Sequence, residues 1–343
     1  MSVKIGSIST LLPEFLGAGD YSKITVLVDE NTGKNCYPLI KALLPEHILI
    51  KIKSGEELKN LSTCQHIWQV MTDNELDRHS LMIDLGGGVI GDMGGFCAAT
   101  YKRGIDFIQI PTTLLAQVDA SVGGKLGIDF NGYKNHIGVF QLPETVLIDA
   151  DFLKSLPWAE LRSGFAEVAK HCLIADGTKW DEIRRIDFDD QDFADLIAHS
   201  VEIKKEVVAS DPTEKGRRKI LNFGHTLGHA IETYFLESPE KERLLHGEAI
   251  AAGMICEASI SLERGLIDES LFLEIEEFIF SIYGKVEILE GDLEAILQHT
   301  LQDKKNKGGQ VRFSLLDGKG SCAFDVICNK EEMEKALRQY IGE

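Results

Sequence analysis

The sequence has no uncharged apolar run that approaches the length of a membrane-spanning helix, which needs about 20 residues. Its N-terminus, MSVKIGSIST, lacks the apolar core of a secretory signal. The 7 cysteines are scattered without a CxxC pair, and their odd number fits free thiols better than a disulfide framework. These absences predict a cytoplasmic protein that has no membrane segment.

Basic charge is also scarce, because 36 lysines and arginines stand against 55 acidic residues, for a formal net charge of -19. This balance argues against non-specific nucleic-acid binding, which requires clustered cations. An anionic small substrate would require a local basic pocket within an acidic surface. The chain of 343 residues, 44% of them hydrophobic, has the length of about two domains of roughly 150 residues each.

The first half of the chain alternates strand-like and helix-like segments. Short runs rich in β-branched and apolar residues predict strands at 23–28, 47–52, 80–85, 106–110 and 144–148. Helical patterns lie between several of them, at 56–71 and 89–100. Strands that alternate with helices predict a mostly parallel sheet covered on both faces.

The pattern changes near Leu156-Pro157, where long helical segments begin. They are predicted at 160–172, 193–210, 220–235 and 248–263, and a hairpin is predicted at 311–324 around Asp317-Gly318. We therefore expect an N-terminal α/β domain over residues 1–156 and a mostly α-helical C-terminal domain over residues 157–343.

A glycine-rich loop follows the third predicted strand. Gly86, Gly88 and Gly91 match GxGxxG between a strand and a helix, an arrangement that lets a backbone approach a pyrophosphate at a helix N-terminus. The alternative is a turn that only packs a helix on a strand. Asp29, at the carboxyl end of the first predicted strand, is a better candidate for the ribose than Asp106, which is predicted to begin a strand.

The segment NFGHTLGHAIE, residues 222–232, carries two histidines four positions apart. His225 and His229 therefore share one helix face and could both reach a metal ion. His246 and Glu167 complete the candidate ligands, since two histidines and one carboxylate form a common catalytic zinc set. The spacing favours His225 and His229 as ligands, but it does not decide which histidines bind metal, and a structural role is the alternative for each.

Other polar residues stand in unusual surroundings. The segment 111–138 looks like a partly buried loop that carries Asp119, Lys125, Lys134 and Asn135, and buried lysines need anionic partners. Lys170 lies three residues after Glu167, which is the spacing of an ion pair on one helix face. The cations and acids between 202 and 218 could form a solvated charged face instead of a site.

Several segments in order resemble the 3-dehydroquinate synthase family of the sugar phosphate cyclase superfamily. They are GGGVIGDMGGF, TYKRGIDFIQIPTTLLAQVDASVGGK, the KN of GYKNHIG, FAEVAK, LNFGHTLGHAIE, LHGEA and the DKK of residues 303–305. The resemblance spans residues 54–305. One departure is that the family commonly has GKN where this chain has GYKN, so the glycine is displaced by one position.

The resemblance implies a Rossmann-like NAD-binding α/β domain joined to a mostly α-helical metal- and substrate-binding domain, with the active site in the cleft between them. It implies a carbon–oxygen lyase that converts 3-deoxy-D-arabino-heptulosonate 7-phosphate to 3-dehydroquinate and phosphate in the shikimate pathway of aromatic amino acid biosynthesis. NAD transiently oxidises the substrate, phosphate is eliminated, NADH returns the hydride, and an intramolecular aldol reaction closes the ring. The implied cofactors are NAD and one divalent metal ion, zinc or cobalt.

The resemblance also implies roles for single residues. Glu167, His225 and His246 would hold the metal, whereas His229 would approach the substrate phosphate. The implied catalytic residues are Asp119, Lys170, Lys204, Glu214 and His229. The implied substrate contacts are Arg103 from the neighbouring subunit of a homodimer, Lys125, Asn135, Lys204, Arg218, Asn222, His229 and Lys304, with Lys305 as the alternative to Lys304. The implied NAD contacts are Asp29, Asn31, Ser54, Gly55, Glu56, Lys59, Gly87, Gly88, Val89, Ile90, Gly91, Asp92, Thr112, Thr113, Asp119, Lys125, Lys134, Phe152 and Ser155.

Three other functions compete with this one. Another sugar phosphate cyclase would act on a substrate without a carboxylate, and the cations Lys204 and Arg218, suited to clamp a carboxylate, argue against it. A metal-dependent polyol dehydrogenase would accumulate NADH and would not need so many cations. A non-catalytic NAD-binding module would bind the dinucleotide without turnover.

Overall fold

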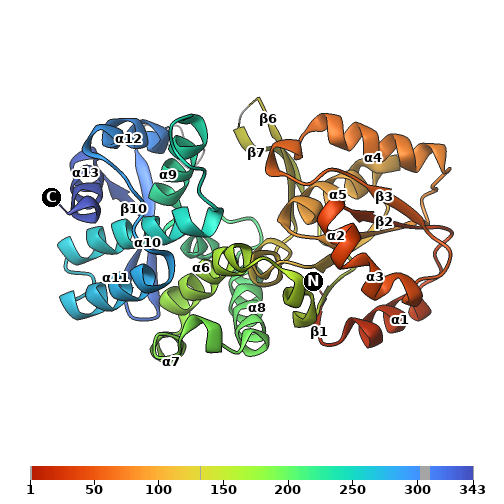
Figure 1. Cartoon of the computed structure of the whole chain (residues 1–343), viewed down its shortest axis with the longest axis horizontal. Helices are drawn as coiled ribbons and strands as arrows, with labels where there is room; N and C mark the ends of the chain where they lie inside the picture. The colour runs from red at the N-terminus through yellow and green to blue at the C-terminus, as the bar shows by residue number, and fades with distance from the viewer. Residues whose placement is uncertain (1, 132, 302–309, 343) are drawn as a thin grey trace. The chain divides into compact units, whose positions relative to one another are not determined.

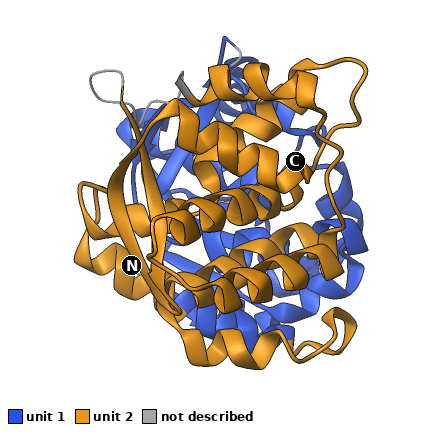
Figure 2. Ribbon diagram, turned by 90° about the vertical axis from the view of Figure 1, so that its left-hand side faces the viewer, with its two compact units in different colours: residues 1–161, 193–201 blue, residues 162–192, 202–343 orange. Residues whose placement is uncertain are grey.

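The computed structural model describes residues 2–131, 133–301 and 310–342. The chain forms two compact units, and Figure 1 shows the sheet in one and most of the long helices in the other. Unit 1 comprises residues 1–161 and 193–201, and unit 2 comprises residues 162–192 and 202–343 (Figure 2). The second unit is therefore not a single continuous segment, because the N-terminal half of one of its helices groups with unit 1.

Unit 1 is built on a six-stranded sheet whose hydrogen-bonded pairs are all parallel. The strand order is β1-β8-β5-β4-β2-β3. The strands are β1 (Val3–Ile5), β2 (Ile24–Val28), β3 (Ile48–Lys51), β4 (Leu81–Gly86), β5 (Asp106–Pro111) and β8 (Thr145–Ile148). The chain leaves β2 toward β3 and then crosses to β4 on the other side of β2, so the direction of strand order reverses between β2 and β4. Ligands of open α/β sheets bind beside such a reversal.

Both faces of this sheet are covered, because the side chains of a strand alternate between its faces. On β4, Met82 packs into one hydrophobic cluster, whereas Ile83 packs into another. The first cluster includes residues of α4 (Leu61–Asp73) and α5 (Gly88–Thr100), and the second includes residues of α1 (Ile8–Ala18) and α3 (Tyr37–Ile40) and Cys36, the C-cap of α2 (Glu30–Asn35). The predicted parallel sheet with helices on both faces is confirmed.

Two parts of unit 1 differ from the prediction. The three-residue strand β1 was not predicted, so the glycine loop follows the fourth strand and Asp29 follows the second. The predicted loop at 111–138 contains a short π-helix, η4 (Ala116–Ala120), and most of an antiparallel hairpin of β6 (Lys125–Phe130) and β7 (Tyr133–Phe140). Its strands are rich in small and polar residues, but Leu126 and Ile128 are buried in the first cluster and anchor the hairpin.

Unit 2 is mostly α-helical, as predicted. Its helices are α6 (Trp158–Ala175), α7 (Gly177–Ile183), α8 (Phe193–Ser210), α9 (His225–Glu237), α10 (His246–Glu263), α11 (Glu269–Tyr283), α12 (Leu293–Leu301) and α13 (Lys330–Ile341), with the first residues of α6 and α8 assigned to unit 1. Helix α10 is buried along most of its length and packs against α9, α11 and α13. It is therefore the central helix of this unit.

Two predicted boundaries in unit 2 are wrong. The predicted helix 220–235 is divided, because Gly224 adopts a left-handed conformation with φ +79° and α9 begins only at His225. A short 3-10 helix, η7 (Arg217–Asn222), precedes it. The predicted hairpin is formed by β9 (Val311–Gly318) and β10 (Ser321–Cys328), but Gly318 pairs with Ser321, so the turn lies at Lys319-Gly320 instead of Asp317-Gly318.

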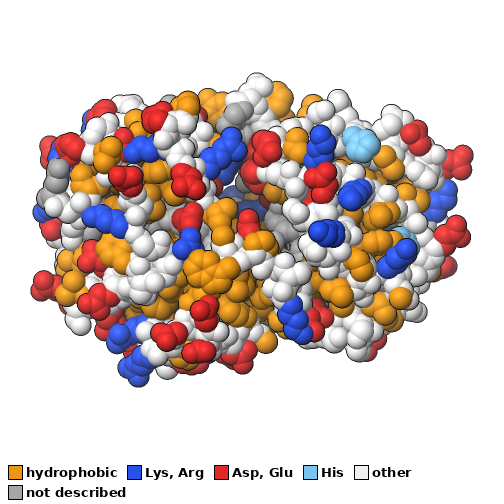
Figure 3. Space-filling model, in the orientation of Figure 1, with side chains coloured by type: hydrophobic (Ala, Val, Ile, Leu, Met, Phe, Trp, Pro, Cys, Tyr) orange, Lys and Arg blue, Asp and Glu red, His pale blue; other side chains and the backbone are white. Residues whose placement is uncertain are grey.

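Acidic, basic and hydrophobic side chains are interspersed over the face drawn in Figure 3, and the acidic residues outnumber the basic ones in the sequence. Among the described helices, none has a hydrophobic stretch long enough to cross a lipid bilayer.

Candidate active site

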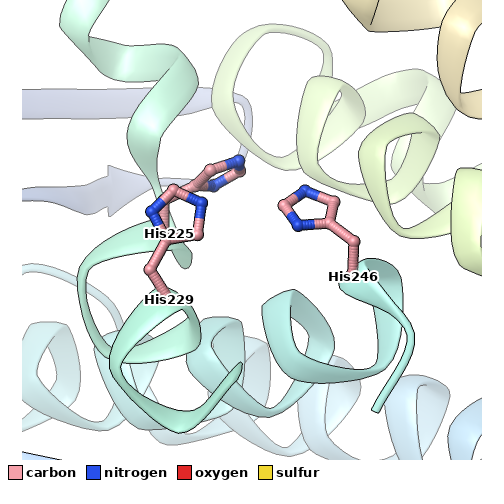
Figure 4. A group of neighbouring side chains, drawn as sticks. All are labelled: His225, His229 and His246. Atoms are coloured by element: carbon pink, nitrogen blue, oxygen red, sulfur yellow. The ribbon is translucent and has the colours of Figure 1, made fainter. Parts of the chain in front are cut away.

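Three histidines converge in unit 2. His225 and His229 lie on α9 and His246 is the first residue of α10, and Figure 4 shows their rings turned toward one another. Each offers a ring nitrogen, and these nitrogens lie within 4.8 Å of one another. The structure thus brings the three candidate histidines together.

Glu167 of α6 reaches the same cluster and is completely buried. Its Oε1 lies 3.4 Å from Nε2 of His225 and 3.7 Å from Nε2 of His246. Donor atoms that share one zinc ion at about 2 Å each are separated by similar distances. The carboxylate and the two imidazoles therefore fit one small divalent cation, while His229 is close enough that proximity alone does not exclude it.

The outer nitrogens of two histidines are held by neighbouring oxygens. Nδ1 of His225 lies 3.1 Å from the carbonyl oxygen of Phe223, and since a carbonyl only accepts, Nδ1 is the protonated nitrogen in this hydrogen bond. Nδ1 of His246 lies 3.6 Å from Oε1 of Glu232. Such partners orient imidazole ligands and leave Nε2 free to coordinate. The sequence analysis missed Glu232, although it stands one turn after His229 in the same segment.

The two histidines differ in their electrostatic surroundings. Burial, followed by the positive charge of Lys170, lowers the pKa of His225 well below its usual value. Burial also lowers the pKa of His246, but hydrogen bonds with Glu167 and Glu232 outweigh it and raise that pKa to about 9. His225 is therefore held neutral, which is the form that binds metals.

Close contact between α6 and α10 sets the position of His246. A Cβ added to Gly247 would lie 2.0 Å from the carbonyl oxygen of Ser163, so only glycine lets the two backbones approach. Gly247 also donates its N–H to Oγ of Ser163 at 2.9 Å. Glu248 accepts from the N–H of Leu245 at 2.9 Å and forms an ion pair with Arg162 of α6. These contacts fix the start of α10 beside the helix that carries Glu167.

The predicted cations of unit 2 include two buried side chains. Lys170 donates to Oε2 of Glu167, and both side chains are only 1% exposed. Lys204 on α8 is also buried. Buried ammonium groups are stable only when paired. Lys170 lies close enough to the histidine cluster to act on the same small molecule.

The segment before α9 holds three more predicted residues. Arg218 is 2% exposed and donates from Nη1 to the carbonyl oxygen of Pro212 at 2.8 Å. Asn222 donates to Oε1 of Glu214 at 2.9 Å, and Glu214 itself has a positive φ of 57°. Asp211 accepts hydrogen bonds from the N–H groups of residues 215, 216 and 218, which folds the loop that presents Arg218.

In unit 1 the residues predicted to contact the cofactor follow the carboxyl ends of the strands. Asp29 follows β2, Gly87 and Gly88 follow β4, and Thr112 and Thr113 follow β5. Carboxyl ends of parallel strands meet at one edge of a sheet, so these residues share that edge. Helix α5 starts there with the N-cap Gly87 and without a capping side chain, which leaves its first N–H groups suited to a phosphate.

A hydrogen-bond network around the buried Lys59 joins three residues predicted from the family pattern. Lys59 is 3% exposed and donates to Oδ2 of Asp92 at 2.6 Å and to Oδ1 of Asn135 at 2.7 Å. Asn135 has a positive φ of 49° and donates its N–H to Asp129 at 2.7 Å. The network ties the β6–β7 hairpin to α5 and to the segment before α4.

The remaining predicted residues lie at several places. Asp29 caps α2 by accepting from the N–H of Thr32 at 2.7 Å, and Phe152 is buried in the second cluster. The structure places the others as follows: Asn31 on α2, Ser54 and Gly55 before η2 (Glu56–Leu58), Glu56 on it, Val89, Ile90 and Gly91 on α5, Asp119 on η4, Lys125 at the start of β6, Lys134 on β7, and Ser155 at the end of η5 (Ala150–Ser155).

One further predicted substrate residue, Arg103, lies on the surface of unit 1. Arg103 is exposed, has a positive φ of 72°, and lines a surface pocket with Asp77, Arg78, His79 and Lys102. Lys304, like Lys305, lies outside the described residues.

Comparison with known proteins now identifies the family. Residues 49–163 match the family model of the 3-dehydroquinate synthase N-terminal domain, and residues 164–306 match that of the C-terminal domain. The chain is 42% identical over 343 residues to the 3-dehydroquinate synthase of Alkaliphilus metalliredigens, covering 98% of this chain and 94% of the relative. It is 37% identical over 334 residues to that of Parabacteroides distasonis, covering 96% and 94%.

A solved structure shares the fold. The 2-epi-5-epi-valiolone synthase of Streptomyces hygroscopicus, with NAD+ and Zn2+ bound, aligns with a TM-score of 0.87 at 24% identity over 99% of this chain and 96% of the other. At this identity the likeness supports the fold alone. The matches over both halves of the chain, together with the relatives at about 40% identity, show that this protein is an enzyme of the 3-dehydroquinate synthase family.

Proposed function

We propose that the protein converts 3-deoxy-D-arabino-heptulosonate 7-phosphate to 3-dehydroquinate and phosphate, using NAD without net redox change and one divalent metal ion. The observation that carries the proposal is the cluster formed by the buried Glu167 and the partly buried His225 and His246, beside the buried Lys170, in a chain that belongs to this family. This reaction belongs to the shikimate pathway, and we propose that the protein carries it out in the cytoplasm.

Glu167, His225 and His246 are the proposed metal ligands. Their donor atoms are close enough to share one cation, His225 is held neutral, and a hydrogen bond from its Nδ1 leaves Nε2 for the metal. A divalent ion held there would supply Lewis-acid polarisation of the substrate hydroxyl, and NAD would supply the hydride acceptor. His229 is proposed as the residue that approaches the substrate phosphate.

The chain's own polar residues orient the substrate and move protons. Lys170 is proposed to donate to the oxygens at the reacting carbon, and Asp119 to relay protons to and from them. Lys204 and Arg218 are proposed to hold the carboxylate, for which a planar guanidinium offers two parallel donors. The proposed phosphate contacts are Lys125, Asn135, Asn222, His229 and Lys304, with Glu214 orienting Asn222 through their hydrogen bond.

The proposed NAD site lies along the carboxyl edge of the sheet. Gly87 and Gly88 at the start of α5 leave the backbone open to a pyrophosphate, and Asp29, which follows the neighbouring strand β2, suits the adenosine ribose. Lys59 is proposed to hold Asp92 and the hairpin in place around the dinucleotide.

We further propose a homodimer in which the partner's Arg103 contacts the substrate phosphate. The exposed side chain and the positive φ of Arg103 support a role beyond packing, because such a backbone conformation is costly for a residue other than glycine. Sedimentation of the purified protein tests the assembly directly, and a monomer with full activity would refute this part.

The deciding experiment measures phosphate release from 3-deoxy-D-arabino-heptulosonate 7-phosphate with NAD, with and without a chelator. We expect release that stops with the chelator, resumes with Zn2+ or Co2+, and leaves no net NADH. Steady NADH accumulation with a polyol would instead favour a dehydrogenase. Absence of release by folded, metal-loaded protein, with release from another sugar phosphate, would favour a different cyclase.

A further inference from the structure

Glu257 is a fully buried carboxylate on α10 to which the sequence analysis gave no role. Its Oε2 accepts from the N–H of Gly224 at 2.7 Å, and its Oε1 accepts from the N–H groups of Thr226 at 2.9 Å and Leu227 at 3.0 Å. The first N–H groups of a helix have no partner within the helix, and a carboxylate there also meets the positive end of the helix dipole. Glu257 therefore fixes the first turn of α9.

One of these hydrogen bonds leads directly to His225. The N–H of Gly224 and the carbonyl of Phe223 belong to the same peptide group. Its N–H donates to Glu257, while its carbonyl oxygen accepts from Nδ1 of His225 at 3.1 Å. A peptide group bonded at both ends is held in orientation and polarised, so its carbonyl is a better acceptor. The carboxylate thus acts through one peptide group on the ring of a proposed metal ligand.

Close packing also constrains the next peptide group, which joins residues 224 and 225. A Cβ added to Gly253 of α10 would lie 2.1 Å from the carbonyl oxygen of Gly224 and 2.6 Å from the nitrogen of Gly228. Helix α10 also begins with His246. A single helix therefore carries one proposed ligand at its first residue and, three turns later, the carboxylate that orients another.

We propose that Glu257 is a positioning residue of the metal site, which sets the ring orientation and the tautomer of His225 through the peptide group of residues 223 and 224. The inference rests on the proposed metal site. A carboxylate that only stabilised α9 would contribute to folding without changing the affinity for metal, so the two roles can be separated by measurement.

The test is a Co2+ titration of the full chain, read by visible absorbance and by competition with a chelator, for the parent protein and for Glu257→Gln. The amide keeps the shape but turns one acceptor into a donor that faces backbone N–H groups. We expect the apparent dissociation constant for Co2+ to rise about 10- to 100-fold, the usual effect of losing an outer partner of a ligand, with a shifted absorbance band. If Glu257→Gln does not fold, Glu257→Asp, which shortens the reach, is measured with the same expectation.

The matched control is Asp292→Asn. Asp292 is also a buried carboxylate of unit 2, accepting from the N–H of Leu289 at 2.9 Å and from the hydroxyl of Tyr234 on α9 at 2.6 Å. None of these hydrogen bonds of Asp292 involves the peptide group before His225. We therefore expect the Co2+ affinity of the Asp292→Asn variant to stay within about twofold of that of the parent. Unchanged affinity and spectrum in the Glu257 variant, or an equal loss in the control, would overturn the positioning role. A parent protein that binds no Co2+ would instead refute the proposed metal site itself.

Discussion

The ammonium group of Lys170 donates to Oε2 of Glu167, while Oε1 of the same carboxylate lies 3.4 Å from Nε2 of His225. One buried carboxylate is thus shared between a cation of the chain and the proposed metal site. Breaking a buried ion pair by removing one partner leaves an uncompensated charge, which is strongly unfavourable. A divalent ion bound at the histidines would supply that compensation, so the metal and Lys170 are expected to interact through Glu167.

The first prediction concerns Lys170→Met. We expect phosphate release to fall about 10²- to 10⁴-fold, the usual contribution of a group that transfers or positions a proton. Metal affinity should be retained or increased, because a positive charge that repels the ion is removed. Lys205→Met is the matched control, since Lys205 forms an ion pair with Glu202 at the same spacing but on an exposed face. Loss of metal from the Lys170 variant would contradict the proposed division of roles.

The second prediction separates the ligands among the three histidines. His246→Ala is expected to lose the metal and the activity while the protein stays folded. His229→Ala should keep the metal, measured by chelator competition, but bind the phosphorylated substrate more weakly. If His229→Ala loses the metal and His246→Ala retains it, the ligand assignment is wrong, and the pair four residues apart on α9 holds the ion after all.

The third prediction tests the carboxylate contact through Arg218→Ala. Hydrogen bonds to charged groups contribute about 1.5–3 kcal/mol, so KM for the carboxylated substrate should rise about 10- to 100-fold. Arg217→Ala is a close control, because the neighbouring guanidinium is half exposed and pairs with Glu206 at 2.9 Å. Inhibition by analogues with and without a carboxylate completes the test. A loss that is equal for both analogues would exclude a carboxylate-specific role.

The sequence predicted the sheet and the helical half because their signals are local. The strands β2 and β4 read as mostly apolar runs, interrupted only by Thr25 and Asp84, and all of their residues are buried. The strand β1 and the hairpin of β6 and β7 were missed, because three residues give no periodicity and the hairpin sequence is rich in glycine and polar residues. The grouping of residues 193–201 with unit 1 could not be predicted either, because these residues lie within one continuous helical pattern.

The functional site could be predicted only in part from the sequence, for the same reason. The spacing of His225 and His229 was visible, but the choice between them as ligands came from the family resemblance. The contacts that orient the site join distant positions, 33 residues apart for Gly224 and Glu257, and 76 residues apart for Lys59 and Asn135. Such pairs are created by tertiary packing, and a single sequence carries no periodic signal for them.

The last prediction concerns Asp84 on β4, two residues before the glycine loop. Its side chain is buried, neither carboxylate oxygen has a hydrogen-bond partner among the described residues, and burial raises the pKa of this carboxyl well above its ordinary value. The unfolded chain releases this proton near pH 4 but the folded protein keeps it, so the group lowers the free energy of unfolding by about 1.4 kcal/mol per pH unit above that point, until the folded pKa is reached.

Asp84→Asn removes this titration while keeping the shape that fits against Gly94, where an added Cβ would lie 2.1 Å from Oδ1. The free energy of unfolding of the variant, relative to that of the parent, should therefore increase as the pH rises from 4 toward neutral. A contribution of the substitution that does not depend on pH would not change this slope. Urea unfolding at several pH values measures the slope. Thr25→Val, which removes a buried hydroxyl from the neighbouring strand β2, should change stability by an amount independent of pH. A pH-independent difference for Asp84→Asn as well would mean that the folded protein ionises Asp84 normally, and that water or an unrecognised partner reaches the carboxylate beneath the glycine loop.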